Sequence, residues 1–260
     1  MFSASSWVLL LVVGFLFGMV VGSFLNVCIY RIPAGGSIVR PRSRCGSCGA
    51  LIKWYQNVPV FSFLALRGRC AACGEAISWR YPLVETLTGA LFSLLIFRFG
   101  PQPFVPVLML FAAVLVVITF IDLDHQIIPD VISLPGILAG FVCSFLVPWV
   151  SWTDSLLGIL VGGGSLYLVA SGYSLLAKKE GMGGGDIKLL AMIGAFLGWK
   201  AVLPIVFFAS IFGTLVGVPV MLVQKADGKL AIPFGPFLSV GALVYLLWGP
   251  LIISWYLHLF

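Results

Sequence analysis

Long runs of apolar residues, separated by shorter polar segments, dominate the chain. A run of about 20 apolar residues is long enough to cross a bilayer as a helix. The runs lack the short alternating segments of about 10 residues that are typical of membrane β-barrels. The pattern predicts an all-α polytopic membrane protein with about eight transmembrane helices, at residues 7–30, 81–98, 104–121, 131–150, 155–177, 187–199, 201–224 and 233–257.

The composition excludes a soluble domain. Of the 260 residues, 61% are hydrophobic and only 9% are charged. The amino-terminal residues up to Trp7 include no basic side chain, which a cleavable signal peptide would carry. We therefore expect the first apolar run to remain as a membrane helix.

Residues 31–80 form the longest polar segment and carry most of the positive charge. This segment contains eight Lys and Arg residues and only one acid, Glu75. Positive loops stay in the cytoplasm and suit anionic headgroups, so membrane lipid is favoured as a partner over nucleic acid. Alternation then places both termini outside, and the cytoplasmic side gains five more bases: Lys178, Lys179, Lys188, Lys225 and Lys229.

Two Cys-x-x-Cys pairs lie within this basic segment. Each pair can present two thiolates to one metal ion, and four thiolates complete a tetrahedral structural zinc site. Disulfides are the alternative, but cytoplasmic thiols are kept reduced. We predict that Zn2+ is bound and helps a small loop domain to fold, with the ligands Cys45, Cys48, Cys70 and Cys73.

Acidic residues meet apolar segments at two places on the predicted cytoplasmic side. Asp122 directly continues the third apolar run, and Asp186 follows the glycine-rich stretch 181–185 and precedes the short sixth run. An ionisable group at the hydrocarbon edge is costly and is therefore a functional candidate, although Asp186 alone could equally be a helix N-cap. Two carboxylates at one depth can share a proton and act as the acid and base of an aspartic peptidase.

Two further acids near Asp122 have ordinary structural explanations. Asp124 is interpreted as a solvated loop acid. Asp130 follows Pro129 at the start of the fourth apolar run, where an N-cap residue is expected.

Taken together, the motifs resemble those of the type IV prepilin peptidases, over essentially the full length. The motifs that carry the resemblance are Gly22-Ser23-Phe24-Leu25-Asn26-Val27 with Tyr30-Arg31, the two Cys-x-x-Cys pairs, Arg80-Tyr81-Pro82-Leu83-Val84-Glu85, Asp122 with Ile128-Pro129-Asp130, Gly183-x-Gly185-Asp186, and Ile232-Pro233-Phe234-Gly235-Pro236.

The resemblance implies a function. Asp122, seven residues before Pro129, and Asp186 would be the catalytic pair, with Gly183 and Gly185 supporting the loop or the substrate. The substrates would be type IV prepilins or pseudopilins, whose short basic leader is removed at the cytoplasmic face of the bacterial inner membrane. The new N-terminal residue would then be methylated with S-adenosylmethionine, in support of pilus assembly or type II secretion.

The same resemblance suggests a division of the chain. Residues 1–30 would form the first transmembrane helix, 31–80 a zinc-binding cytoplasmic domain associated with methyl transfer, and 81–260 the membrane peptidase core. Candidates for binding the methyl donor are Asn26, Arg69 and Glu85, each of which also has a structural explanation.

Two other functions compete with this interpretation. A transporter could use the acids to bind protons or ions beside the short sixth helix. A membrane methyltransferase could carry the same acids in a structural role. The clustering of the acids on one membrane face, rather than at the midplane, argues against the transporter.

Overall fold

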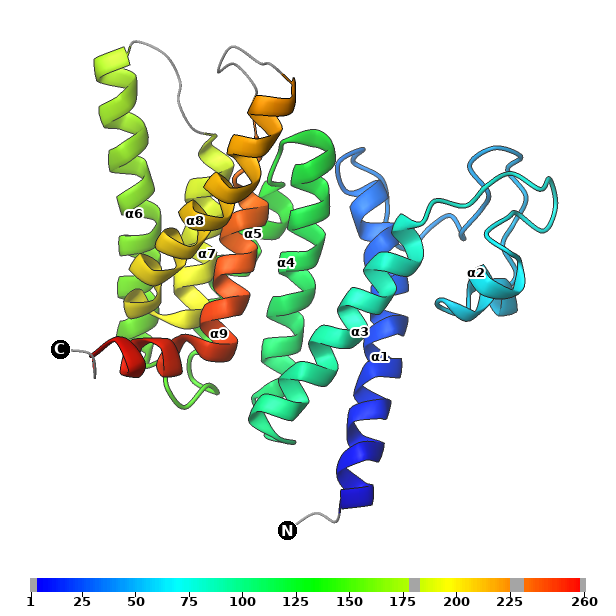
Figure 1. The fold of residues 1–260 in the computed structure, drawn as a ribbon, viewed down its shortest axis with the longest axis horizontal. Coiled ribbons are helices and arrows are strands. Elements are labelled where there is room, and N and C mark those ends of the chain that lie inside the picture. Colours follow the sequence, from blue (N-terminus) through cyan, green and yellow to red (C-terminus); the bar gives the residue numbers. More distant parts are fainter. Residues whose placement is uncertain (1–3, 178–182, 225–231, 258–260) are drawn as a thin grey trace. The chain divides into compact units, whose positions relative to one another are not determined.

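A helix lies in each of the eight apolar runs in the computed structural model (Figure 1), which describes residues 4–177, 183–224 and 232–257, although the helix of the run 131–150 ends at Cys143. Five are long and apolar enough to cross a membrane: α1 (Ala4–Arg31), α3 (Arg80–Phe99), α4 (Val105–His125), α6 (Trp152–Ala177) and α8 (Trp199–Gln224). The other apolar helices are α5 (Asp130–Cys143) and α7 (Gly184–Leu197), which have 14 residues each, and α9 (Gly235–Leu257). The all-α membrane fold is confirmed; the count of eight transmembrane helices is not, since five helices of the described part of the chain meet the length and hydropathy of a membrane span.

The chain divides inside α4 into two compact units, Met1–Val117 and Ile118–Phe260. Several residues used in the sequence analysis lie outside the described residues, namely Lys178, Lys179, Gly181, Met182, Lys225 and Lys229.

In the first unit, α1 and α3 lie side by side in unusually close contact (Figure 1). Glycines recur every fourth residue along α1, and a Cβ at Gly18 would lie 2.7 Å from the Cα of Gly89. A Cβ at Gly22 would likewise lie 2.7 Å from the Cα of Glu85. Small residues permit such backbone contact where lipid offers no hydrophobic driving force, so these glycines set the helix spacing.

The first unit also contains the polar segment between α1 and α3. It holds only a one-turn 3-10 helix (Trp54–Asn57), the short α2 (Phe61–Ala65) and two isolated β-bridges. A 50-residue segment with so little regular structure needs another source of order, which the cysteines described below can supply.

In the second unit, α7 is the central helix. All residues from Leu189 to Leu197 are buried, and the helix packs against α5, α6, α8 and α9. A helix that is apolar all round is stable inside a protein, which explains why the sixth apolar run is short. It ends at Gly198, whose φ of +80° favours glycine, and α8 begins at the next residue.

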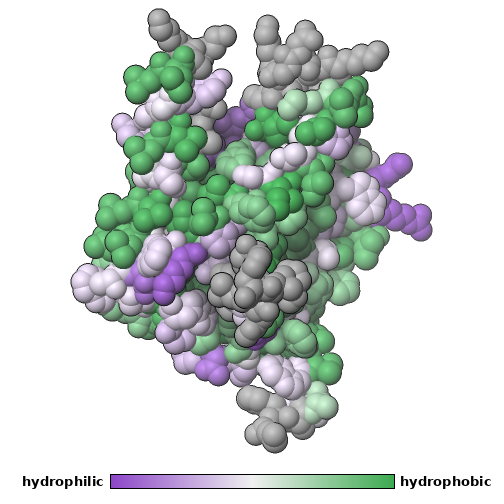
Figure 2. Space-filling model, turned by 60° about the vertical axis from the view of Figure 1, so that its left-hand side comes forward, coloured by the Kyte–Doolittle hydropathy of each residue, from purple (hydrophilic) through white to green (hydrophobic). Residues whose placement is uncertain are grey.

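Apolar side chains cover much of the face shown in Figure 2. The helices α6 and α8 contribute many exposed aliphatic and aromatic residues, including Leu168, Leu175, Leu176, Leu203, Phe207, Leu215, Leu222 and Val223. So large an exposed apolar surface is expected of helices that face lipid.

Candidate functional site

Asp122 occupies the last turn of α4 and points inward. Its side chain is only 5% exposed, as is expected of the face that also carries the fully buried Ile118 and Ile121. A buried polar group is costly unless it is hydrogen-bonded. One carboxylate oxygen, Oδ2, accepts a hydrogen bond of 3.0 Å from the backbone N–H of Gly235, the first residue of α9.

Asp186 lies in the first turn of α7. The N-cap of this helix is Gly183, so the interpretation of Asp186 as the N-cap is wrong. The Asp186 backbone N–H donates to the Gly183 carbonyl over 3.2 Å, which makes Asp186 the third helical residue. Asp186 is partly buried.

Ile128 connects the segments that carry the two acids. A Cβ at Gly185, next to Asp186, would lie 2.9 Å from the Cβ of Ile128. A Cβ at Gly235 would lie 3.2 Å from the Cδ1 of the same isoleucine and 2.6 Å from Oδ2 of Asp122. The end of α4, the start of α7 and the start of α9 therefore converge around one side chain.

The two glycines of the Gly-x-Gly-Asp motif have different surroundings. Gly185 packs tightly against Ile128, which leaves no room for a side chain. Gly183 is exposed, and among the described residues only the backbone nitrogen of Gly185 lies within 4.0 Å of the position of its Cβ. Only Gly185 is thus required by close packing in this structure.

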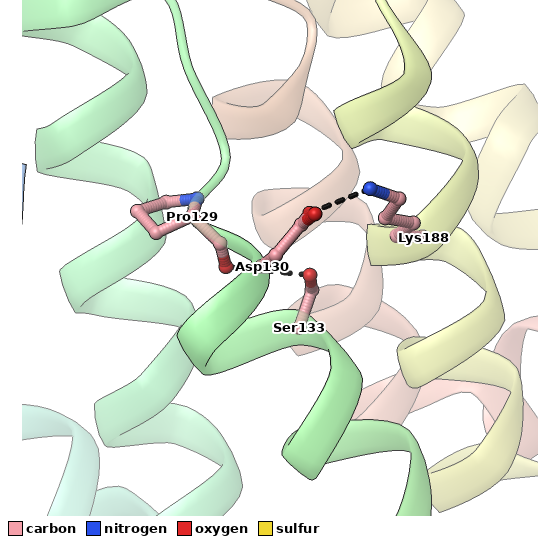
Figure 3. Close-up of polar contacts among 4 residues, drawn as sticks. All are labelled: Pro129, Asp130, Ser133 and Lys188. Carbon is pink, nitrogen blue, oxygen red and sulfur yellow. Dashed lines mark hydrogen bonds and ion pairs between the residues drawn. The ribbon is translucent and has the colours of Figure 1, made fainter.

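Asp130 has a role that differs from the expected one (Figure 3). The N-cap of α5 is Pro129, and Asp130 is the first helical residue, with Oδ1 2.6 Å from Nζ of Lys188. The carbonyl of Pro129 accepts a 3.3 Å hydrogen bond from the Ser133 hydroxyl. The ion pair between Asp130 and Lys188 joins α5 to α7, two residues after Asp186. Asp124 is exposed, as expected of a solvated acid, but it lies in the last turn of α4 and not in a loop.

The four cysteines of the loop come together as predicted. The sulfur atoms of Cys45, Cys48, Cys70 and Cys73 all lie within 4.8 Å of one another, and no disulfide links them. Tetrahedral Zn–S bonds of 2.3 Å would place sulfurs about 3.8 Å apart. The Sγ atoms of Cys45 and Cys73 are 3.9 Å apart, so the cluster fits a zinc ion.

Each cysteine pair sits on the same kind of turn. The N–H of Gly49 donates to the carbonyl of Cys45, and the N–H of Gly74 donates to that of Cys70, at 3.0 and 2.9 Å. Both glycines have positive φ, +71° and +73°, which side-chain-bearing residues rarely adopt.

The turn geometry also activates a thiol. Hydrogen bonds from the backbones of Cys48 and Ser47 lower the pKa of the Cys45 thiol to about 6. Desolvation and hydrogen bonds with the other three thiols raise the pKa of Cys73 to about 12, so Cys45 is closer than Cys73 to the thiolate form that binds metal.

Two of the three candidates for binding a methyl donor make hydrogen bonds within the protein. Asn26 is buried and donates through Nδ2 to the carbonyls of Gly22 and Tyr81, which ties α1 to α3. Glu85 accepts a 2.7 Å hydrogen bond from the N–H of Val60 and thereby fixes the loop to α3. Arg69 is exposed. The contacts of Asn26 and Glu85 are explained without a ligand.

Two parts of the site were not identified from the sequence. Gly235 was noted only as part of a motif, although it contacts Asp122 directly. Lys188 was counted only as a cytoplasmic base, although it pairs with Asp130. The motif around Gly235 was the available signal, since a glycine between two prolines suggests a backbone that must come close to something.

Two protein-family profiles match the chain. The profile of the Bacterial Peptidase A24 N-terminal domain matches residues 16–99, and that of the Type IV leader peptidase family matches residues 109–218. The first match includes the cysteine cluster, and the second includes Asp122 and Asp186. No solved structure matches the chain.

Several curated bacterial proteins are similar over most of the chain. A protein of Stutzerimonas stutzeri named prepilin leader peptidase/N-methyltransferase is 36% identical, over 99% of this chain and 97% of its own length. A protein of Legionella pneumophila with the same name is 36% identical, over 96% and 95%. Another, from Myxococcus xanthus, is 47% identical over 82% of this chain, and the match spans 64% of that protein.

Proposed function

The chain belongs to the type IV leader peptidase family, and we propose that it is a membrane aspartyl endopeptidase that also methylates its product. It removes the short basic leader of type IV prepilins or pseudopilins and N-methylates the new N-terminal residue, in support of pilus assembly or type II secretion. The observation that supports the proposal is the packing around Ile128, which brings the end of α4, with the buried Asp122, close to Gly185, next to the partly buried Asp186.

The two carboxyl groups act as one acid–base unit. Two neighbouring carboxylates cannot both ionise cheaply, so the pair retains one proton. The ionised carboxylate takes a proton from water as the water oxygen bonds to the scissile carbonyl carbon, and the protonated carboxyl gives its proton to the carbonyl oxygen. The intermediate collapses when a proton reaches the leaving nitrogen and the C–N bond breaks, which restores the original pair.

The surroundings of the pair favour this chemistry. Asp122 is shielded from water at the end of a membrane helix, and Gly185 leaves no side chain between α7 and Ile128. Gly183 is exposed at the start of α7, and an extended substrate segment would approach the pair there. The apolar stem of the substrate would lie against the membrane helices, as amphipathic helices lie in apolar grooves.

The cysteine cluster holds a structural zinc ion in this proposal. The four thiolates of Cys45, Cys48, Cys70 and Cys73 close the coordination shell, so the metal supplies folding energy to residues 31–80 and leaves no position for a substrate. Methyl transfer is assigned to this domain, together with the adjoining ends of α1 and α3.

S-adenosylmethionine supplies the methyl group to the new amine, by transfer from its sulfonium. Asn26, Arg69 and Glu85 remain candidates for its site. Because two of them already satisfy backbone groups, no step of the mechanism is assigned to them.

The chain is a multi-pass inner-membrane protein, and we place the acid pair and residues 31–80 on the cytoplasmic side, with both termini outside. The distribution of Lys and Arg supports this orientation, since positive loops are retained in the cytoplasm. The basic side chains of the loop would contact anionic headgroups of membrane lipid.

Cleavage and methylation can be tested separately with one substrate. Purified protein is incubated with a prepilin precursor, with and without S-adenosylmethionine, and the product mass is measured. Asp122→Asn and Asp186→Asn should each lower the rate of leader removal about 1,000-fold, because general acid–base catalysis contributes up to about 10,000-fold. Both variants should still methylate a pilin that was cleaved beforehand.

Asp124→Asn is the matched control, since Asp124 lies on the same helical turn as Asp122 but is exposed. It should cleave at the wild-type rate. Full cleavage by either of the other two variants would refute the assignment of the pair.

A further inference from the structure

The hydrogen bond between α9 and Asp122 joins residues that are 113 positions apart in the chain. Gly235 is the first helical residue of α9, since the carbonyl of Phe234 accepts the first bonds, from Phe237 and Leu238 at 3.1 Å. The N–H groups of a first helical turn have no partner within the helix. The Asp122 carboxylate supplies such a partner from a different helix.

Gly235 also has no room for a side chain. A Cβ at this position would lie 2.6 Å from Oδ2 of Asp122, closer than Cβ atoms approach other atoms in real structures. The Cδ1 of Ile128 would lie 3.2 Å away on the same side. The Asp122 carboxylate is therefore in direct contact with the backbone of α9. A larger residue in place of Gly235 would displace either this carboxylate or the start of α9.

The direction of the bond matters for the charge of Asp122. A backbone N–H that donates to a carboxylate stabilises its ionised form, and the positive end of the α9 dipole adds to this effect. Asp186, by contrast, lies in the first turn of its own helix and is only partly buried. The two acids are thus placed in unequal environments.

We propose that Gly235 is a positioning residue of the catalytic centre, whose N–H orients Asp122 and holds it as the ionised member of the pair. This inference rests on the proposed peptidase function. Asp122 then takes the proton from the attacking water, and Asp186 gives its proton to the carbonyl oxygen of the scissile bond. The start of α9 becomes the third element of the site, beside the end of α4 and the start of α7.

Gly235→Ala is the test, with Gly241→Ala as the matched control. Gly241 lies in the same helix, and a Cβ there would lie 2.8 Å from the carbonyl oxygen of Ile205, on α8. The two substitutions thus introduce similar steric overlaps, one with the Asp122 carboxylate and the other with the backbone of α8. Each full-length variant is assayed for kcat and KM of leader removal and for methylation of a pilin cleaved beforehand.

Gly235→Ala should lower kcat of cleavage about 100-fold, since a displacement of about 1 Å can cost that much, and should leave KM and methylation within about twofold. Gly241→Ala should keep kcat within about twofold per folded protein. A wild-type kcat in Gly235→Ala, an equal fall in methylation, or an equal fall in Gly241→Ala would overturn the inference.

The result is separable from a failure of the proposed function. If Asp122→Asn abolishes cleavage while Gly235→Ala cleaves normally, the peptidase assignment stands and the role of Gly235 falls. If Asp122→Asn cleaves normally, both fall.

Discussion

Each cysteine pair of the metal site is held by its own turn, whereas the residues around Asp122 come from three segments far apart in the chain. The two turns repeat the same hydrogen bond, from Gly49 to Cys45 and from Gly74 to Cys70. The acid site instead depends on packing between helices, with Ile128 in contact with the segments that begin α7 and α9.

The difference predicts that the two sites respond differently to substitutions. A local turn keeps its shape when distant packing changes, so the cysteine cluster should depend on its four sulfurs and little else. A site assembled by packing should be sensitive to small changes of volume at the helix contacts. Changes that affect one site while sparing the other are therefore the appropriate experiments.

The largest expected effect comes from removing two metal ligands. Cys48→Ser combined with Cys73→Ser should abolish zinc binding, because only two of the four thiolate ligands remain. The effect on folding should be large, since the apparent free energy of zinc binding in small structural sites is about 10–16 kcal/mol. Residues 31–80 should become sensitive to limited proteolysis, and methylation should be lost, while leader removal stays within about threefold. Metal analysis of the purified protein and the two activity assays measure this.

Cys143→Ser is the control, since Cys143 lies in α5 and outside the cluster. It should retain zinc and both activities. Zinc bound in full by the double variant would contradict the metal site, and equal loss of cleavage would contradict the independence of the two sites.

A smaller effect is expected from Gly185→Ala, which adds one methyl group to the acid site. The Cβ would lie 2.9 Å from the Cβ of Ile128, so α7 must shift and move Asp186 with it. Leader removal should slow about 10-fold, by the same dependence on geometry. Zinc content should be unchanged.

Gly184→Ala is a close control for this substitution. It changes the preceding residue of the same helical turn, where nothing lies within 4 Å of the added Cβ. It should cleave at the wild-type rate and gain up to about 1 kcal/mol of helix stability. Equal rates for the two variants would show that packing against Ile128 does not position Asp186.

The smallest effect is expected at the ion pair of Asp130 and Lys188. The two side chains are 57% and 38% exposed, and exposed pairs contribute about 0–1 kcal/mol. Lys188→Ala should therefore change leader removal no more than about threefold, as measured by initial rates. If the pair helps to align α7, the exchange of the two charges in Asp130→Lys with Lys188→Asp should restore the rate. A 100-fold loss of rate in Lys188→Ala would show that Lys188 does more than form this ion pair.

The sequence predicts the helices and both clusters because each leaves a local signal. Apolar runs mark α1 and α3 to α9, and Cys-x-x-Cys spacing marks the metal turns. Asp122 and Asp186 stand out because an acid at the edge of an apolar helix is rare. These signals do not require knowledge of which helices are neighbours.

The remaining parts could not be predicted, because they arise from contacts between distant segments. The bond between Gly235 and Asp122 leaves no periodic pattern in the sequence. The position of Asp130 after a proline predicts an N-cap, but the proline itself is the N-cap. The Asp130 carboxylate forms an ion pair with Lys188 of another helix. The shortness of α7 was visible, whereas its central position was not.

The claim that Asp122 and Asp186 form one catalytic unit is tested most directly by comparing the two single variants with the double variant. The measurement is the single-turnover rate of leader removal for Asp122→Asn, Asp186→Asn and both together. Groups that act as a unit give strongly non-additive losses, so the double variant should cleave about as slowly as either single variant. Losses that multiply, or a single variant that cleaves at the wild-type rate, would contradict the shared-proton pair.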